Sequence, residues 1–391
     1  MAINTAAVSW QRTAQDGRAR YGTLHTPHGA VATPAFMAVG TLGSLKGLTV
    51  QQAENCGQEI LLANTYHLAL RPGEDIVHHL GGVHGLSGWR GPMLTDSGGY
   101  QVFSLAEQRN ITEEGVTFRS HIDGARIHLT PESSIRIQRY LGADMIMAFD
   151  ECPPLDLPLE SLRKSIERTL RWLQRCHQAW IDGESGWPGG HHQQALLGIV
   201  QGGLDHDLRR FSLRETLAQD LPGYAIGGLS VGESADQRNA VLDWIGDDLP
   251  AHKPRYLMGV GTPLDIVEAV YRGIDLFDCV LPTRMGRHGI AYTDDGPLHL
   301  KRQQYRDDRR PIDEDTPSDA TRLPRGTIRH LLQAGEHLAG QVISLHNIAY
   351  YQRLMRRLQE AISQGSLDTF VTTFRARYRL READTLQRQS Q

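Results

Sequence analysis

The stretch LFDCVLPTR at residues 276–284, a short apolar run that ends in an acid and a turn, decides the fold. Seven runs of the same kind precede it: AFMAVG (35–40), EILLANTY (59–66), PMLTDSGG (92–99), ADMIMAFDE (143–151), ALLGIVQGG (195–203), GYAIGGL (223–229) and PRYLMGVG (254–261). Segments with helical periodicity, such as 162–180 and 262–273, lie between several of them. Nearly continuous apolar strands that alternate with helices are typical of a parallel sheet buried on both faces. Eight such units predict an α/β protein, a (β/α)8 TIM barrel.

Two stretches depart from this alternation. At 115–129, GVTFRSHIDGARIHL places two alternating segments around Asp123-Gly124, which is typical of a hairpin inserted in a loop. Residues 294–347 follow the eighth run, and their first part is rich in Asp, Arg, Pro and Thr, so we expect an inserted C-terminal subdomain. Apolar residues at three- and four-residue steps from Ile348 onward predict a closing helix and a tail over 348–391. Residues 1–391 are therefore expected to form a single barrel domain that carries this subdomain.

Composition places the chain among ordinary folded enzymes. With 391 residues, 40% hydrophobic and 22% charged, it is neither a disordered chain nor a disulfide scaffold. No window approaches the roughly 18 consecutive apolar residues of a membrane span. The first residues lack the pattern of a secretory signal, so we expect a cytoplasmic location and no membrane partner. The four cysteines form no paired motif, which indicates free thiols in a reducing compartment.

Polar residues follow the apolar runs at the positions where barrel enzymes carry their sites, the carboxyl ends of the strands. Among them, Asp278 and Asp96 suit chemistry at an anomeric carbon, one as nucleophile and one as acid/base partner. The glycine pairs in DSGGYQ, VQGG and IGGLSVGE allow a flat ligand to approach the backbone closely. A lone Asp at a strand end is commonly a helix cap, and glycines commonly end tight loops, so each feature alone also has a structural interpretation.

A purine-like ring would fit beside these glycines. Asp150 and Gln201, which also follow apolar runs, could read the edge of the ring. Tyr100 and Met258 could stack on its two faces.

The charge of the chain is unevenly distributed. The net charge of −4 hides 18 basic against 13 acidic residues from Arg284 to the end, and 23 against 32 before it. A basic C-terminal quarter can steer a nucleic acid onto one face of the protein. Arg284 and Arg287, six and nine residues after Asp278, are placed to hold phosphates or base edges. A solvated surface with ordinary salt bridges is the alternative interpretation.

Together these motifs resemble those of the bacterial tRNA-guanine transglycosylases, also called queuine tRNA-ribosyltransferases. The similarity covers most of the chain and includes MAVGTLGSLKGL (37–48), NTYHLALRPG, LTDSGGYQVFSL, FDEC, GIVQGG, AIGGLSVGE, YLMGVGTP, GIDLFDCVLPTRMGRHG and HNIAYYQRLM. The resemblance implies that guanine at the anticodon wobble position of certain tRNAs is exchanged for a 7-deazaguanine, in queuosine modification, through a covalent ribosyl-aspartate. No cofactor is expected, because one glycosidic bond replaces another.

The resemblance also implies roles for individual residues. Asp278 is expected to be the nucleophile and Asp96 the general acid/base. The implied base-binding residues are Ser97, Gly98, Gly99, Tyr100, Asp150, Cys152, Gln201, Gly228, Leu229 and Met258. The implied tRNA-binding residues are Gly259, Val260, Gly261, Thr262, Asp265, Thr283, Arg284 and Arg287. A homodimer, in which one protomer helps to orient the tRNA held by the other, is implied as well.

The choice of base depends on two positions. Cys152 and Val231 stand where bacterial members resemble one another and where the eukaryotic catalytic subunit typically has a different pair, with glycine in place of the valine. A branched side chain there leaves less room for a bulky 7-substituent. We therefore expect 7-aminomethyl-7-deazaguanine to be favoured over queuine.

One family feature is missing from the sequence. Members usually carry three cysteines spaced C-x-C-x-x-C after a Pro-(Leu/Ile)-Asp segment, which bind a structural zinc together with a later histidine. Here Pro311-Ile312-Asp313 is followed by EDTPSDATRLPRG without a cysteine, and only His346 of that ligand set is left. No structural zinc is therefore expected, and packing within 294–347 has to replace it.

Three other functions stay open at this point. A barrel glycoside hydrolase would also place paired carboxylates on the rim, although the aromatic content of 7% is low for sugar stacking. A non-catalytic tRNA-binding partner subunit would not need both Asp96 and Asp278. A relative that acts on DNA or on another tRNA position would share the same barrel residues.

Overall fold

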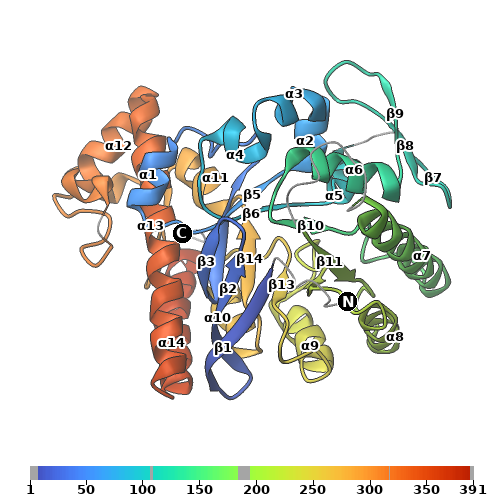
Figure 1. Cartoon of the computed structure of the whole chain (residues 1–391). Helices are drawn as coiled ribbons and strands as arrows, with labels where there is room; N and C mark the ends of the chain where they lie inside the picture. The colour runs from blue at the N-terminus through green and yellow to red at the C-terminus, as the bar shows by residue number, and fades with distance from the viewer. Residues whose placement is uncertain (1–7, 106–108, 184–193, 317, 388–391) are drawn as a thin grey trace.

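Eight parallel strands close a barrel in the computed structural model, which describes residues 8–105, 109–183, 194–316 and 318–387 (Figure 1). Around the barrel the strands are β4 (Ala35–Gly40), β5 (Leu61–Ala63), β6 (Met93–Thr95), β10 (Met145–Met147), β11 (Ala195–Val200), β12 (Gly223–Ile226), β13 (Arg255–Leu257) and β14 (Leu276–Cys279). The last strand pairs with the first in parallel register, with Phe277 opposite Phe36. Each strand lies within one of the eight apolar runs, so the predicted (β/α)8 barrel is confirmed.

Helices follow the strands on the outside of the barrel. They are α1 (Val50–Asn55), α2 (Thr65–Leu70), α3 (Glu74–His79), α4 (Gly82–Ser87), α5 (Gly99–Leu105), α6 (Pro131–Leu141), α7 (Leu159–Gly183), α8 (His206–Leu217), α9 (Ala235–Ile245), α10 (Pro263–Tyr271) and α11 (Leu281–His288). Several begin at the residues that helix chemistry favours. Ser234 caps α9 in a reciprocal bond pair with Gln237, and Thr262 caps α10 ahead of Pro263.

The strands separate two hydrophobic cores, because neighbouring side chains point to opposite faces. Met37, Leu197 and Tyr256 belong to the cluster that fills the barrel. Phe36 and Leu257, each next to one of these in sequence, belong to the larger cluster between strands and helices. Burial on both faces explains why the runs are almost continuously apolar.

An antiparallel sheet that the sequence did not predict closes the amino end of the barrel. It consists of β1 (Ser9–Asp16), β2 (Ala19–Thr26) and β3 (Gly29–Thr33). Trp10, Leu24 and Val31 of this sheet join the cluster that fills the barrel. The turn between β2 and β3 is fixed where β10 begins, because His28 Nδ1 lies 2.7 Å from the buried carboxylate of Asp144.

The predicted insertion at 115–129 is a three-stranded antiparallel sheet. Its strands are β7 (Arg109–Ile111), β8 (Val116–Arg119) and β9 (Arg126–Leu129). The turn between β8 and β9 contains Gly124 at φ 74°, a conformation that favours glycine. The hairpin is therefore present, and β7 adds a strand that the sequence did not indicate.

The residues after α11 form a lobe with a small core of its own. Its elements are β15 (Ile290–Thr293), β16 (Gly296–His299), two 3₁₀ turns, η1 (Gln303–Tyr305) and η2 (Asp319–Arg322), and α12 (Arg325–Ala334). The core residues are Ala291, Leu298, Leu300, Tyr305, Ile312, Ala320, Ile328, Val342 and Ile343. The long helix α13 (His337–Ser363) begins before the expected Ile348, because its first half packs on this core.

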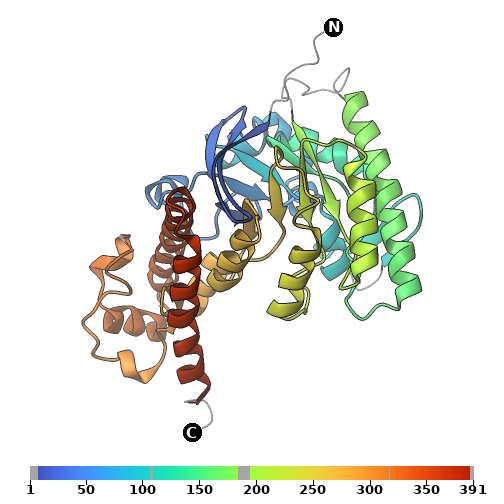
Figure 2. The ribbon, with the colours of Figure 1, turned by 90° about the horizontal axis from the view of Figure 1, so that it is seen from below.

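The second half of α13 packs on the barrel, and α14 (Leu367–Gln387) lies alongside it. In both ribbon views the orange and red C-terminal segments lie on the side of the barrel opposite the green helices α7 and α8 (Figures 1 and 2). None of the helices in the described ranges is both long and apolar enough to cross a bilayer.

Candidate active site

A cavity of about 360 Å³ opens at the carboxyl ends of the barrel strands. The structure brings most of the expected site residues to its wall, from loops that are far apart in the sequence. These are Asp96, Ser97, Gly98, Tyr100, Asp150, Cys152, Gln201, Gly228, Leu229, Met258, Gly259, Asp278 and Arg284. Gly99 lies just behind the wall, where its N–H donates to Ser97 Oγ at 3.1 Å.

The carboxylate of Asp278 accepts its two hydrogen bonds through a single oxygen, Oδ1. The hydroxyl of Tyr256 and the backbone N–H of Gly259 both donate to Oδ1, at 2.6 and 2.7 Å. Gly259 turns its N–H toward the carboxylate at φ 70°, in the region that favours glycine. Burial raises the pKa of Asp278, and these two hydrogen bonds oppose the rise. In the described part of the chain Oδ2 receives no hydrogen bond, so it is the free oxygen that faces the cavity.

The second carboxylate, Asp96, has a different environment. The backbone N–H of Thr65 donates to its Oδ1 at 2.8 Å, and the side-chain amide of Asn64 donates to Oδ2. Burial raises the pKa of Asp96 to about 7, with a smaller contribution from the negative charge of Asp278. A carboxyl with a pKa close to neutral pH can give and take a proton, which is what a general acid/base requires.

A buried amide and a third carboxylate form the inner wall of the cavity. Gln201 Nε2 donates to Asp150 Oδ2 at 2.7 Å, and Ser97 Oγ lies 3.3 Å from Asp150 Oδ1. Burial raises the pKa of Asp150 to about 6. Gln201 Oε1 is buried and has no hydrogen-bond partner among the described residues, although buried acceptors normally have one. A ligand N–H would satisfy it.

The glycine at 228 keeps this wall open. A Cβ built there would stand 2.3 Å from Gln201 Oε1, and the backbone has φ 65°. Any other residue would therefore collide with the amide and strain the backbone. At Gly228, the absence of a side chain is therefore what leaves room for a flat ligand to approach the backbone.

Several residues that shape the cavity were not anticipated. Asn64, Thr65 and Tyr256, which hold the two carboxylates, belong to this group. Asn64 directly follows β5, so the rule that selected Asp96 could have found it. Tyr256 lies inside β13, where sequence alone reads it as a core residue.

Arg209 of α8 is another unanticipated residue, because a helical arginine usually faces solvent. Its side chain is fully buried. It donates to the carbonyls of Gly203 (2.8 Å), Val200 (2.9 Å) and Gly227 (2.8 Å). Burial lowers the pKa of Arg209 to about 10, so it stays charged and ties together the loops after β11 and β12.

Cys152 and Val231 both lie on the cavity wall. Burial raises the pKa of Cys152 to about 12, so it is a neutral thiol at neutral pH. The loop around Val231 is fixed by Glu233, which accepts from the N–H groups of Ser230 (2.6 Å) and Val231 (3.0 Å). Arg238 neutralises this buried carboxylate at 3.1 Å.

The residues expected to contact tRNA divide into two groups. Gly259, Arg284 and Arg287 are exposed. The others make contacts within the fold. Val260 and Thr283 are buried, and the carbonyl of Gly261 accepts a hydrogen bond from the hydroxyl of Tyr351. Thr262 caps α10, and Asp265 forms an ion pair with Arg238. In this structure these residues stabilise the fold.

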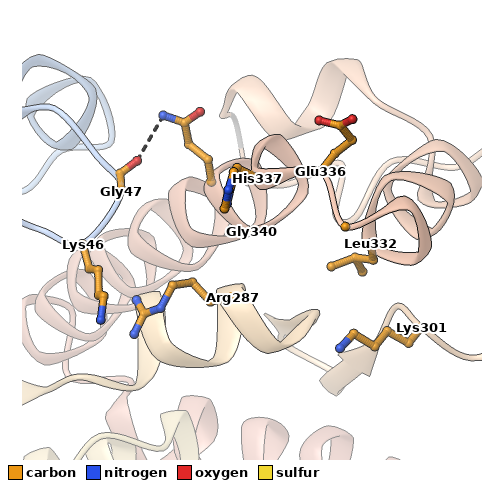
Figure 3. Close-up of a pocket in the computed structure, with 10 residues that line it drawn as sticks. Lys46, Gly47, Arg287, Lys301, Leu332, Glu336, His337 and Gly340 are labelled. Atoms are coloured by element: carbon orange, nitrogen blue, oxygen red, sulfur yellow. Dashed lines mark hydrogen bonds between the residues drawn. The ribbon is translucent and has the colours of Figure 1, made fainter.

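A second cavity, of about 470 Å³, lies beside the exposed arginines and is lined by cations (Figure 3). Lys46 follows β4, Arg287 comes from α11, and Lys301 follows β16. In Figure 3 the side chains of Lys46 and Arg287 extend toward one another. The start of α13 lines the same cavity, where the positive end of the helix dipole is accompanied by the carboxylate of its N-cap residue, Glu336.

The position of the family's structural zinc holds residues that do not fit the metal. No cysteine follows Cys279 in the sequence. The N–H at His346 Nε2 donates to the carbonyl of Tyr292 (2.8 Å), and the buried Nδ1 has no partner among the described residues. Burial lowers the pKa of His346 to about 4, so the ring is neutral. Thr316 donates to Asp313 Oδ2 at 2.6 Å, and a single imidazole with a hydroxyl does not make a zinc-thiolate site.

Within the described ranges, one other group has the residue types of a metal site, at the amino end of the barrel. The group consists of His28, His84 and Asp144. Each residue offers one possible ligand atom, and the three atoms lie within 4.8 Å of one another. The two imidazole rings are stacked, with centroids 3.7 Å apart and planes at 15°. Nearly parallel rings cannot both direct an in-plane lone pair at one ion. Asp144 also accepts the N–H of Met93 at 2.9 Å, so the group acts as a structural hydrogen-bond cluster.

Comparison with known proteins connects this geometry to a family. A model of the queuine tRNA-ribosyltransferase family matches residues 15–380. The queuine tRNA-ribosyltransferase of Thermus thermophilus is 52% identical over 369 residues, which is 94% of each chain. The one of Deinococcus radiodurans is 48% identical over 375 residues, 96% of this chain and 93% of the relative. The one of Novosphingobium aromaticivorans is 47% identical over 373 residues, 95% and 98% of the two chains.

Proposed function

The chain belongs to the queuine tRNA-ribosyltransferase family and is a tRNA-guanine transglycosylase, and from that premise we propose how its residues exchange the base. Asp278 attacks the anomeric carbon of the wobble ribose, and Asp96 carries the proton of the leaving and entering bases. One observation carries the proposal: both carboxylates line a cavity whose wall holds Gln201 Oε1, a buried acceptor with no partner among the described residues. Such a cavity suits a flat base with several N–H groups.

In the first half of the reaction, Asp278 Oδ2 bonds to the anomeric carbon while the bond from that carbon to guanine N9 breaks. The electron pair of the broken bond stays with the base, and Asp96 donates a proton to it. Tyr256 and Gly259 engage only Oδ1 of Asp278, which leaves Oδ2 for the attack. The products are a covalent ribosyl-aspartate and neutral guanine.

The second half reverses these steps with another base. The incoming 7-deazaguanine loses its N9 proton to Asp96 as N9 bonds to the anomeric carbon, and the ester bond to Asp278 breaks. Asp96 thus ends the cycle protonated, as it began. Its pKa of about 7 supports both roles, because neither protonation state is costly at neutral pH.

Recognition of the base falls to the inner wall. Asp150 and Gln201 Oε1 accept the N–H groups on the pyrimidine edge, and Tyr100 and Met258 stack on the two faces. The 7-substituent points toward Cys152 and Val231, so the chain favours 7-aminomethyl-7-deazaguanine over queuine. The support for this choice is steric, since both side chains line the cavity and the loop of Val231 is held by Glu233.

The tRNA backbone lies across the face that carries Arg284, Arg287 and the cationic cavity. Lys46 and Lys301 line the same cavity as Arg287 and, with Glu336 as the one carboxylate among the described residues that line it, give it a net positive charge that suits a polyanion. We place the reaction in the cytoplasm, where tRNA is modified, and include a homodimer in the proposal, with one protomer orienting the tRNA that the other modifies. No cofactor takes part in the exchange.

The test is incubation of the purified chain with unmodified tRNA and 7-aminomethyl-7-deazaguanine, followed by mass mapping of the modified nucleotide. The expected product carries the new base at the wobble position only, and Asp278→Asn forms none while it still binds tRNA. Release of guanine without incorporation would instead indicate a glycoside hydrolase. Modification at another position, or in DNA, would contradict the proposed substrate.

A further inference from the structure

A largely buried arginine of α13, Arg353, contacts the C-terminal lobe. We propose that, in a chain without the zinc-binding cysteines, the 311–316 loop is held without a metal by Arg353 of α13, which joins this loop to the turn between β15 and β16. The Arg353 cluster consists of Arg353, Asp294, Asp313 and Thr316, and the exposed carboxylate of Asp315 lies 3.6 Å from Arg353 at its margin. The inference depends on family membership and on the missing cysteines, and it is independent of the proposed chemistry of base exchange.

The contacts of Arg353 reach two segments that are far apart in sequence. One terminal nitrogen, Nη1, lies 3.3 Å from Asp313 Oδ2 and 3.1 Å from Thr316 Oγ1. The other, Nη2, lies 3.2 Å from Asp294 Oδ2, in the turn between β15 and β16. Thr316 donates in turn to Asp313 at 2.6 Å. One planar cation thus holds two carboxylates and a hydroxyl, as a metal would hold several ligands.

The location of these contacts matches the position of the missing zinc ligands. Asp313 ends the Pro-Ile-Asp segment, and Thr316 lies within the stretch where members carry their cysteines. Thr316 is fully buried, and so is His346, the one histidine left of the ligand set, which lies two helical turns before Arg353 in α13. The Arg353 cluster therefore joins the elements that a metal at this position would join.

Burial makes these ion pairs important. The side chains of Arg353, Asp294 and Asp313 are only 16%, 8% and 15% exposed, whereas surface pairs are solvated and contribute little. Asp294 is also contacted by Arg357 Nη1 at 2.5 Å. Asp313 has no second cationic partner among the described residues. Loss of Arg353 would therefore leave the Asp313 carboxylate buried and unpaired, which is strongly unfavourable.

A chelation experiment makes the first test. The full-length chain is exposed to EDTA and 1,10-phenanthroline, and its metal content, melting temperature and amide hydrogen exchange over 311–316 are measured. We expect no bound zinc, an unchanged melting temperature and unchanged protection of this loop. One zinc per chain, together with a lower melting temperature after chelation, would overturn the proposal.

Substitution makes the second test. Arg353→Met should lower the melting temperature by about 4–10 °C and speed exchange in 311–316 more than in the barrel strands. Arg356→Met is the matched control, because Arg356 is exposed on the same helix and makes no contact with the cluster. Equal behaviour of the two variants would refute the role of Arg353.

A double-mutant cycle makes the assignment specific. If Arg353 acts through Asp313, Asp313→Asn should reduce the melting-temperature loss caused by Arg353→Met, so that the two effects are not additive. Strict additivity would show that Arg353 stabilises the lobe by packing alone. These readouts do not require activity, so they remain valid even if the proposed base-exchange chemistry fails its own test.

Discussion

The substitution Tyr256→Phe tests how the nucleophile is kept ionised inside the cavity. The Tyr256 hydroxyl donates to Asp278 Oδ1 at 2.6 Å and favours the charged form of the carboxylate. A hydrogen bond to a charged group contributes about 1.5–3 kcal/mol, and about 1.4 kcal/mol corresponds to one pKa unit. Removal of the hydroxyl should therefore raise the pKa of Asp278 beyond the rise that burial already causes, because the ionised carboxylate loses this stabilisation.

Asp278 has to be ionised to attack, so a higher pKa moves the acid limb of the pH profile to higher pH. The assay is single-turnover incorporation of labelled guanine into tRNA between pH 5 and pH 9. Tyr256→Phe should be most impaired at low pH and recover as the pH rises. Tyr224→Phe is the matched control, since its hydroxyl accepts from the N–H of Leu221 at 3.1 Å, away from the cavity. An acid limb that coincides with that of the unmodified chain would refute this account of Tyr256.

Three further expectations follow from the same structure. Arg287→Gln should weaken tRNA binding and reduce the slope of log affinity against log salt by about 0.7–0.9, measured by titration at several salt concentrations. Val231→Gly should raise kcat/KM for queuine relative to the aminomethyl base by about tenfold, and no change in the ratio would show that this side chain does not limit the 7-substituent. Asp144→Asn should lower the free energy of unfolding by about 1–3 kcal/mol at neutral pH, because it weakens the buried hydrogen bonds that this carboxylate accepts. Hydrogen bonds from His84 and His28 outweigh burial and hold the pKa of Asp144 below its usual value of 3.8, so the difference should shrink as the pH falls below that value.

The barrel could be predicted from the sequence because its strands are buried on both faces. That burial leaves eight short apolar runs separated by helices, a pattern with few alternative interpretations. The β1–β3 sheet was missed because its strands mix polar and apolar residues, as in SWQRTAQD, and only Trp10 of β1 is buried. The start of α13 was missed because its first half serves the small core of the lobe, which is not visible as a local pattern.

The two carboxylates at the centre of the site were identifiable because each ends an apolar run. Their hydrogen-bond partners were not, since Asn64 and Tyr256 are ordinary residues until folding brings them beside Asp96 and Asp278. Arg353 was missed for a related reason. An arginine on an amphipathic helix reads as a surface residue, and only the folded lobe shows the acids around it.

The attachment of Arg209 to three backbone carbonyls at and after the ends of β11 and β12 has an evolutionary consequence. Because one buried guanidinium holds the backbone of the cavity wall at the ends of β11 and β12, mutations at neighbouring positions should displace that backbone little. Val231 lines the cavity and makes none of these contacts with Arg209, so selection can exchange it without loosening this attachment. Lineages of such enzymes could thus acquire new nucleobase preferences by one or two substitutions while the catalytic core stays intact.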